Sequence, residues 1–167
     1  MVSTAVPVDV YLRSTFEPDA DYVDGEIQER PVGEYDHAAW QAALLVYFRQ
    51  NSLKWNVRVQ PELRVQVAET RFRVPDITVL DRDQPIEQIV THPPVAVFEV
   101  LSPDDVMPRM LTKLADYERM GIQGIFVIDP KGSKYRFENG SLLPLASGSI
   151  ACGRLTIDFQ AIESLLD

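Results

Sequence analysis

The sequence contains one cysteine, Cys152, so no disulfide can form within the chain. Its opening segment, MVSTAVPVDVYLRSTF, lacks the basic and apolar regions of a secretory signal. No apolar run approaches the roughly 20 residues that a membrane-spanning helix needs, because even VAVFEVL is interrupted by a glutamate. These absences argue against a secreted or membrane-spanning protein, so we expect a cytoplasmic location and no membrane partner.

Basic residues are scarce, with 16 Lys and Arg against 25 Asp and Glu and a net charge of -9 at pH 7. Clustered Lys and Arg supply the long-range attraction to phosphates, so this balance disfavours a nucleic-acid partner. The charge is uneven, however. Residues 1–36 carry nine acids and two arginines, whereas residues 49–73 carry six basic residues and two acids, a local charge of +4. This second segment either forms solvated strand edges or contacts phosphates.

Several motifs of nucleotide and hydrolase chemistry are also missing. The sequence has no glycine-rich phosphate-binding loop and no nucleophile elbow, and one Cys with two scattered His does not indicate a cysteine hydrolase. The spacing of these residues gives no zinc pattern. Nucleotide-driven chemistry and a zinc site are therefore disfavoured.

The residues that are present are sufficient for a folded domain. Hydrophobic residues make up 46% of the 167, and no repeat or linker divides the chain, so we expect one domain over residues 1–167. Periodicity predicts helices near residues 9–16 and 36–50, through MLTKLADYERM after Pro108 and before Gly121, and near DFQAIESLL. Strands are predicted in VRVQPELRVQV, FRVPDITVL, VAVFEVL and GIFVID, with hairpin turns at Asp24-Gly25 and Asn139-Gly140.

Glu99 interrupts VAVFEVL, a segment whose apolar residues on both faces are typical of a central strand. A buried carboxylate without a partner would cost several kcal/mol, so Glu99 needs a cation. Asp76 lies on the preceding predicted strand, and the two carboxylates can converge if these strands are neighbours. Hard divalent cations such as Mg2+ prefer oxygen ligands and keep waters that can attack phosphorus. The pair is a candidate metal site, although Pro-Asp alone is more typical of a turn.

The order of these features, a strand with Pro-Asp, a strand with an isolated Glu and a helix with an inward Lys, matches a known nuclease arrangement. Over about residues 11–159 the chain resembles the Uma family of putative restriction endonucleases, in the PD-(D/E)XK superfamily. The matching segments are DYVDGEI, RVPDITVL, PPVAVFEVLSPDD, KLADYERMGI and GIFVIDP. The resemblance implies that Asp76 and Glu99 are the motif's acidic pair and that the backbone carbonyl of Val100 is a further metal ligand.

The superfamily pattern places a lysine two residues after the glutamate, but this chain has Leu101 there. In the family the lysine looks displaced to the next helix, and the matching residue is Lys113, beside Leu114 and at helical spacing from Met110 and Tyr117. The resemblance implies that the Lys113 ammonium orients or helps deprotonate the attacking water and offsets charge in the transition state. The alternative is a lysine whose stem packs among apolar side chains while its amine reaches water.

Five further residues are candidates for lesser roles. Asp21 matches a position where the family commonly has Glu, just before the hairpin turn, and Glu26 lies in the same hairpin, where a solvated turn acid is the alternative. His37 matches a family histidine, and a purely structural histidine is the alternative. Arg71 and Arg73 are candidate contacts to nucleic-acid phosphates by position alone.

Together these features predict an α/β fold of the restriction-endonuclease-like type, with a mixed central β-sheet flanked by α-helices and added β-hairpins. The predicted function is hydrolysis of phosphodiester bonds in nucleic acid, with DNA as the expected substrate, Mg2+ or Mn2+ as cofactor and a homodimer as a candidate assembly. The rivals are a non-catalytic binding or regulatory protein with this fold, which the acidic charge supports, and a structural homodimer without a nucleic-acid role. The presence of Asp76, Glu99 and Lys113 together favours catalysis.

Overall fold

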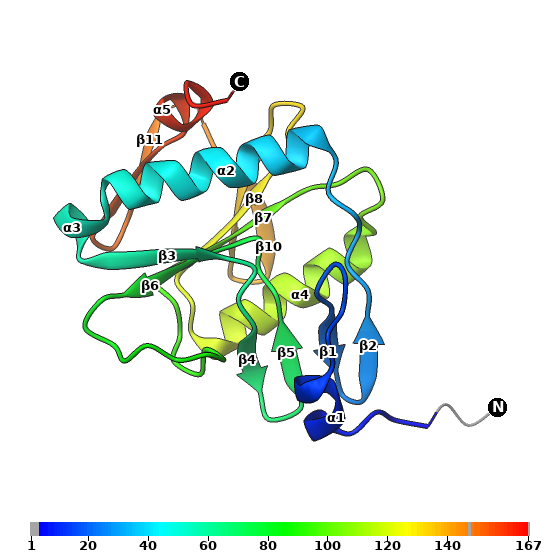
Figure 1. Ribbon diagram of the computed structural model, residues 1–167. Helices are drawn as coiled ribbons and strands as arrows, with labels where there is room; N and C mark the ends of the chain where they lie inside the picture. Colours follow the sequence, from blue (N-terminus) through cyan, green and yellow to red (C-terminus); the bar gives the residue numbers. More distant parts are fainter. Residues whose placement is uncertain (1–3, 147, 167) are drawn as a thin grey trace.

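The computed structural model describes residues 4–146 and 148–166, and its centre is a six-stranded sheet in the order β10-β9-β8-β7-β6-β3 (Figure 1). β7 and β8 are parallel, whereas the other neighbours are antiparallel. The predicted mixed sheet is therefore confirmed, and VAVFEVL contributes a central strand, as expected. The strands are β3 (Val57–Pro61), β6 (Ile77–Asp81), β7 (Ala96–Val100), β8 (Gly124–Ile128), β9 (Lys134–Glu138) and β10 (Ser141–Pro144).

Two smaller sheets accompany the central one. A four-stranded antiparallel sheet has the order β2-β1-β5-β4, and β11 pairs with β12 as a hairpin that the sequence pattern did not predict. Both predicted turns are present, because Asp24-Gly25 joins β1 to β2 and Asn139-Gly140 joins β9 to β10, all four residues having positive φ. The strands are β1 (Asp21–Val23), β2 (Glu26–Gln28), β4 (Val65–Ala68), β5 (Arg71–Arg73), β11 (Ser149–Cys152) and β12 (Leu155–Asp158).

The described residues form the helices α1 (Val8–Arg13), α2 (Tyr35–Gln50), α3 (Ser52–Trp55), α4 (Met107–Met120) and α5 (Phe159–Glu163). α2 and α4 lie on opposite faces of the six-stranded sheet (Figure 1). As predicted, Pro108 lies in the first turn of α4, and Gly121 ends the helix with a φ of 99° that favours glycine. Within the described part of the chain, no helix is long and apolar enough to cross a membrane.

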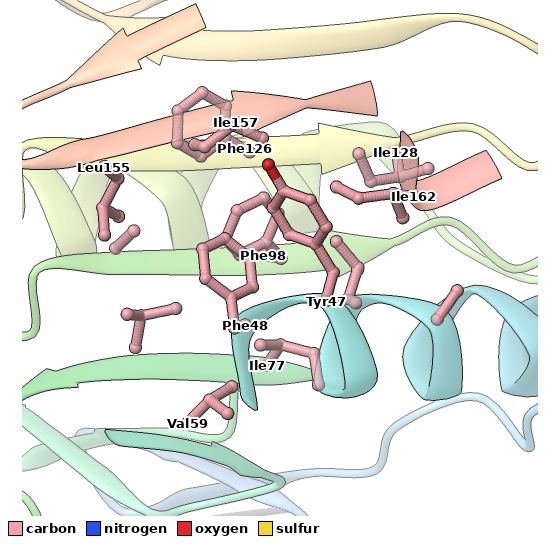
Figure 2. Close-up of a cluster of buried hydrophobic side chains, with 14 of the residues drawn as sticks. Tyr47, Phe48, Val59, Ile77, Phe98, Phe126, Ile128, Leu155, Ile157 and Ile162 are labelled. Atoms are coloured by element: carbon pink, nitrogen blue, oxygen red, sulfur yellow. The ribbon is translucent and has the colours of Figure 1, made fainter. Parts of the chain in front are cut away.

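The larger hydrophobic core lies between α2 and the six-stranded sheet. Figure 2 shows Tyr47 and Phe48 of α2 beside Phe98 of β7, which stacks on Phe126 of β8. The Tyr47 hydroxyl donates to the Thr156 carbonyl at 2.8 Å, which ties α2 to the β11–β12 hairpin. Each large side chain buried here contributes about 1.5–3 kcal/mol, so this core fixes α2 against the sheet.

The opposite face of the sheet packs against α4. Leu114 and Tyr117 of α4 are fully buried in a cluster that includes Val97 of β7 and Val127 of β8. Because side chains alternate along a strand, Glu99 lies on the same face as Val97 and is directed toward α4. The apolar contacts of α4 therefore hold a helix directly over the one carboxylate of this central strand.

Two segments predicted as single strands are each divided between two sheets. VRVQPELRVQV forms β3 and β4 with Glu62 at a φ of 52° between them, and FRVPDITVL forms β5 and β6. Pro75 has no N–H to donate to a strand ladder, and the Val74 N–H donates to the Asp21 carboxylate at 2.9 Å instead. The Glu62 N–H donates to the Asp76 carbonyl, so the two interruptions lie side by side. The expectation that Asp76 lies within a strand is therefore wrong, because Asp76 lies just before β6.

Candidate active site

Asp76 and Glu99 are brought together by the pairing of β6 with β7. The antiparallel register places Ile77 opposite Phe98, so the preceding Asp76 lies opposite Glu99. The Val100 N–H donates to Asp76 Oδ2 at 2.7 Å, which fixes this carboxylate against the end of β7. Both carboxylates are buried, at 2% and 3% exposure. The expectation that these two strands are neighbours is confirmed.

Glu99 has two partners on α4, and both meet the same carboxylate oxygen. Lys113 Nζ lies 2.9 Å from Glu99 Oε1, and the Tyr117 hydroxyl donates to Oε1 at 2.6 Å. Burial raises the pKa of Glu99 to about 7, because it outweighs the attraction of the Lys113 ammonium, and the nearby charge of Asp76 raises it further. Burial thus makes Glu99 costly to keep charged without the Lys113 ammonium beside it.

Lys113 points into the protein and not toward solvent. Its side chain is 9% exposed, and Nζ donates to the Val74 carbonyl at 3.0 Å in addition to its contact with Glu99. Asp21 Oδ2 lies 3.6 Å from the same nitrogen. The alternative of a lysine that reaches water is thus not what the structure shows. Leu101, at the usual position of the lysine, packs against the apolar cluster beneath α4.

Asp76 is surrounded by cationic side chains. Arg30 Nη2 lies 2.5 Å from Oδ1, and His37 Nε2 lies 3.2 Å from Oδ2. Burial alone would raise the pKa of Asp76, but the hydrogen bond from His37 and the charges of Arg30, His37 and Lys113 hold it below the usual value. The hydrogen bond to Asp76 in turn raises the pKa of His37 against the opposing effect of burial. Asp76 is therefore stabilised in its charged form.

Arg30 is a functional-site residue that the sequence interpretation missed. It follows the β1–β2 hairpin, and its guanidinium reaches Asp76 across a separation of 46 positions. The one signal in the sequence is its isolation, since no other Lys or Arg occurs between Arg13 and Arg49. A lone cation in such an acidic segment indicates a specific carboxylate partner, but it does not indicate which one.

These side chains line one cavity of about 340 Å³. Asp76 reaches it from the position just before β6, Glu99 from β7 and Lys113 from α4. Arg30 reaches it from the segment between β2 and α2, and His37 from the first turn of α2. The mouth also includes charged residues from the segment that joins β7 to α4 and from the start of α4, namely Asp104, Asp105 and Arg109. The cavity thus combines buried carboxylates with cations that could contact an anionic substrate.

The model of the Uma2 family, described as putative restriction endonucleases, matches residues 9–137. The chain belongs to the Uma2 family. Among solved structures, a putative nuclease belonging to DUF820 from Anabaena variabilis ATCC 29413 is similar with a TM-score of 0.79 and 20% identity. The match covers 95% of this chain and 98% of that chain. This likeness shows that the fold is the nuclease-type α/β fold that the sequence predicted.

Other comparisons add little to the family assignment. A DrdV–DNA complex solved by cryoEM has a TM-score of 0.45 and 16% identity, over 75% of this chain and 11% of that chain, which is too distant to carry an argument. No curated protein matches the chain.

The structure places Asp21, Arg71 and Arg73 of this Uma2 protein in an ion-pair network that is buried at Asp21 and Arg73 and partly exposed at Arg71. Arg73 is 2% exposed, with Nη1 3.2 Å from Asp21 and Nη2 2.6 Å from Asp116 of α4. Arg71 pairs with Asp116 and with Asp24 of the β1–β2 turn. These contacts join β1, β5 and α4, and they engage both arginines, which were expected at nucleic-acid phosphates, in ion pairs within the protein. Asp21 lies at the edge of this network and lines the cavity.

The two remaining accessory candidates, His37 and Glu26, differ in their position relative to the cavity. His37 contacts Asp76 directly, so it belongs to the site's geometry. Glu26 is exposed at the start of β2 and lies outside the cavity lining, which fits the alternative of a solvated turn acid.

The donor atoms of the cavity fit a hard divalent cation. In residues 4–146 and 148–166, no three His, Cys, Asp or Glu side chains form a cluster suited to a metal, so the side-chain donors are the two carboxylates. Mg2+ binds through one or two carboxylates and keeps several waters. Asp76 and Glu99, with the backbone carbonyl of Val100 at the same cavity, therefore form a donor set that suits Mg2+ or Mn2+.

Proposed function

We propose that this Uma2 family protein is a metal-dependent endonuclease that hydrolyses phosphodiester bonds in nucleic acid, with DNA as the substrate. The observation that carries the proposal is the convergence in one cavity of Asp76, just before β6, with Glu99 of β7 and Lys113 of α4. The family assignment supports a nuclease, and the buried carboxylates give the site the oxygen ligands that this chemistry requires. Asp76, Glu99 and the backbone carbonyl of Val100 would hold the ion.

When bound, Mg2+ or Mn2+ would lower the pKa of a coordinated water and stabilise negative charge on the scissile phosphate. Lys113 is placed to orient that water, because its ammonium is 2.9 Å from Glu99 and is fixed by the Val74 carbonyl. The same ammonium would offset charge that develops on the phosphate oxygens. Asp21, 3.6 Å from Lys113, helps to position the ammonium, and His37 helps to position the Asp76 carboxylate.

Cleavage assays test this proposal directly. Supercoiled plasmid and single-stranded DNA are incubated with wild type in Mg2+, in Mn2+ and in EDTA, with RNA as the comparison substrate. We expect metal-dependent cleavage that Asp76→Asn and Glu99→Gln abolish. Glu69→Gln, a matched change at an exposed acid in the β4–β5 turn, should retain it. Calorimetry with Mn2+ supplies the independent measurement, and equal affinity and stoichiometry in Glu99→Gln and wild type would place the metal elsewhere.

The rival function is a non-catalytic binding or regulatory protein that keeps the nuclease fold. It is favoured by the net charge of -9 and by the ion pairs that engage Arg64, Arg71 and Arg73 of the basic segment 49–73. Folded wild type that cleaves none of the substrates with either metal would support this rival. A homodimer, which light scattering would detect, would double the number of cavities available to one nucleic-acid molecule and is compatible with either function.

A further inference from the structure

Arg30 occupies an unusual position in the cavity. Its side chain is 10% exposed, and Nη2 lies 2.5 Å from Asp76 Oδ1. Among the described residues, Nη1 has no hydrogen-bond partner, and it lies 3.8 Å from Glu62 Oε1, a distance too long for a hydrogen bond. Buried donors are normally satisfied, so this guanidinium is held by a single short ion pair and is not fixed by a complete network.

The oxygens of Asp76 are used unequally. Oδ2 accepts from the Val100 N–H and contacts His37, so the surrounding protein already engages it. Oδ1 has one contact within the described residues, to Arg30. Each carboxylate oxygen has two acceptor sites, so Oδ1 is the oxygen that a metal ion would approach. The Arg30 guanidinium therefore contacts Asp76 Oδ1, the same oxygen that would bind a divalent cation under the proposed function.

We propose that Arg30 is a displaceable counter-ion for Asp76, which neutralises Oδ1 in the absence of metal and leaves it when a divalent cation binds. This inference rests on the proposed function, because it requires the ion to bind between Asp76 and Glu99. Two cations on one carboxylate oxygen in a buried cavity repel each other strongly, so occupancy by Arg30 and by the ion is competitive. Arg30 is in this sense a positioning residue that sets the apparent affinity of the site for metal.

The competition has a measurable consequence. When a binding-competent state is only partly populated, the apparent dissociation constant equals the intrinsic one divided by the populated fraction. If the arrangement with Arg30 away from Asp76 is populated at about one tenth or less, removal of the guanidinium should tighten metal binding by about tenfold or more. A purely structural arginine gives the opposite result, because its loss would disorder Asp76 and weaken binding.

The test is calorimetry with Mn2+ alone on wild type, Arg30→Met and the matched control Arg154→Met. Arg154 pairs with Asp81 at 2.7 Å on β6, away from the cavity lining, so its replacement changes the net charge equally. We expect Mn2+ affinity to rise about tenfold in Arg30→Met and to stay near the wild-type value in Arg154→Met. Unchanged or weaker binding in folded Arg30→Met overturns the inference.

Chemical replacement of the guanidinium sharpens the test. In Arg30→Ala, guanidinium chloride at millimolar concentration, far below denaturing levels, should compete with Mn2+ and weaken its binding, whereas wild type should be insensitive. Absence of competition in Arg30→Ala would show that a gain in affinity has another origin and would overturn the inference.

Failure of the inference and failure of the proposed function are distinguishable. Wild-type Mn2+ binding that disappears in Asp76→Asn, together with equal affinity in Arg30→Met, removes the counter-ion role and leaves the metal site standing. Absence of Mn2+ binding in wild type and in Arg30→Met alike overturns both. Nuclear magnetic resonance of wild type provides a second measurement that does not depend on the folding of a variant. Mg2+ should shift the Arg30 Nε–H signal and leave that of Arg154 in place, and an unshifted Arg30 signal in metal-loaded protein contradicts displacement.

Discussion

The ammonium of Lys113 lies among three acceptors, the Glu99 carboxylate, the Val74 carbonyl and, at 3.6 Å, Asp21. A buried ion pair adds little net stability, but removal of one partner leaves the other charge uncompensated. At the residue scale, the lysine is therefore both the candidate catalytic cation and a condition for burying Glu99. Its two roles can be separated by measurement.

Lys113→Ala should bind metal and fold but lose most cleavage, by about a hundredfold or more. Its free energy of unfolding should fall by about 3–5 kcal/mol, since Glu99 would be left with Tyr117 as its partner on α4. Lys113→Ala combined with Leu101→Lys returns an ammonium to the end of β7 and should recover part of the activity. The measurements are plasmid nicking and urea unfolding followed by circular dichroism. Full activity in folded Lys113→Ala would rule out the displaced lysine.

Glu87 offers a prediction about pH at a site far from the chemistry. Its carboxylate accepts from the side chain and N–H of Thr91, and these bonds together with contacts to His92 lower its pKa to about 2. A carboxyl whose pKa is lower in the folded state stabilises that state above its unfolded pKa of about 4.3 and loses the effect as pH falls toward 2. The protection factor of the Thr91 amide, which is its exchange rate relative to that of an unfolded peptide at the same pH, should therefore fall across this interval. In Glu87→Gln the protection factor should be lower than in wild type at neutral pH and should not change with acid.

Some residues of the candidate site could be predicted from the sequence and others could not. Asp76, Glu99 and Lys113 stand out because a charge interrupts an apolar pattern or because a family motif contains them. Arg30 follows a hairpin in a polar segment, and its importance comes from a partner 46 positions away. No local pattern encodes such a contact. The sequence shows the charge of Arg71 and Arg73 in the same way, but it does not show that both pair with Asp116 of α4.

At the scale of elements, hydrophobic periodicity predicted the existence of most helices and strands but not the sheets to which the strands belong. Alternation in VRVQPELRVQV continues across Glu62, where the backbone turns and the chain passes from one sheet to another. Alternation of apolar and polar residues indicates which face of a strand is buried, but it does not indicate which strand pairs with it. Pro75, which cannot donate to a ladder, was the available signal that FRVPDITVL is divided just before Asp76.

The buried face of α2 provides a prediction at this scale. Phe48 is fully buried, with its ring 5.2 Å from that of Phe98 and 5.9 Å from that of Trp55. Phe48→Ala should lower the free energy of unfolding by about 3–5 kcal/mol, because it removes this contact area and leaves a cavity. Val46→Ala, at a residue 42% exposed on the same helix, should change it by about 0.5 kcal/mol or less. Urea titrations measure both, and similar losses in the two variants would contradict this account of the core.

At the scale of the whole molecule, the charge distribution differs from what the linear sequence indicates. Residues 49–73 carry a local charge of +4, yet Arg64 pairs with Asp19 and Arg73 with Asp21 and Asp116. Folding therefore neutralises much of this segment with acids from distant parts of the chain. Arg73 of this segment lines the proposed substrate site in its ion-paired state, and further cations there come from the β2–α2 segment and α4, as Arg30 and Arg109 illustrate.

This distribution predicts that nucleic-acid binding is weak, strongly salt-dependent and centred on the cavity. Each phosphate neutralised by a protein cation adds about 0.9 to the magnitude of the slope of log affinity against log salt. Arg109 is exposed on the first turn of α4 and lines the cavity, so Arg109→Ala should weaken binding to a DNA duplex and reduce the slope by about 1. Arg49→Ala, at the far end of α2 and outside the cavity lining, should leave the slope unchanged. Fluorescence anisotropy in EDTA, which prevents cleavage, provides the measurement. A flat salt dependence in wild type, or equal slopes in wild type and Arg109→Ala, would show that phosphates do not approach this mouth of the cavity.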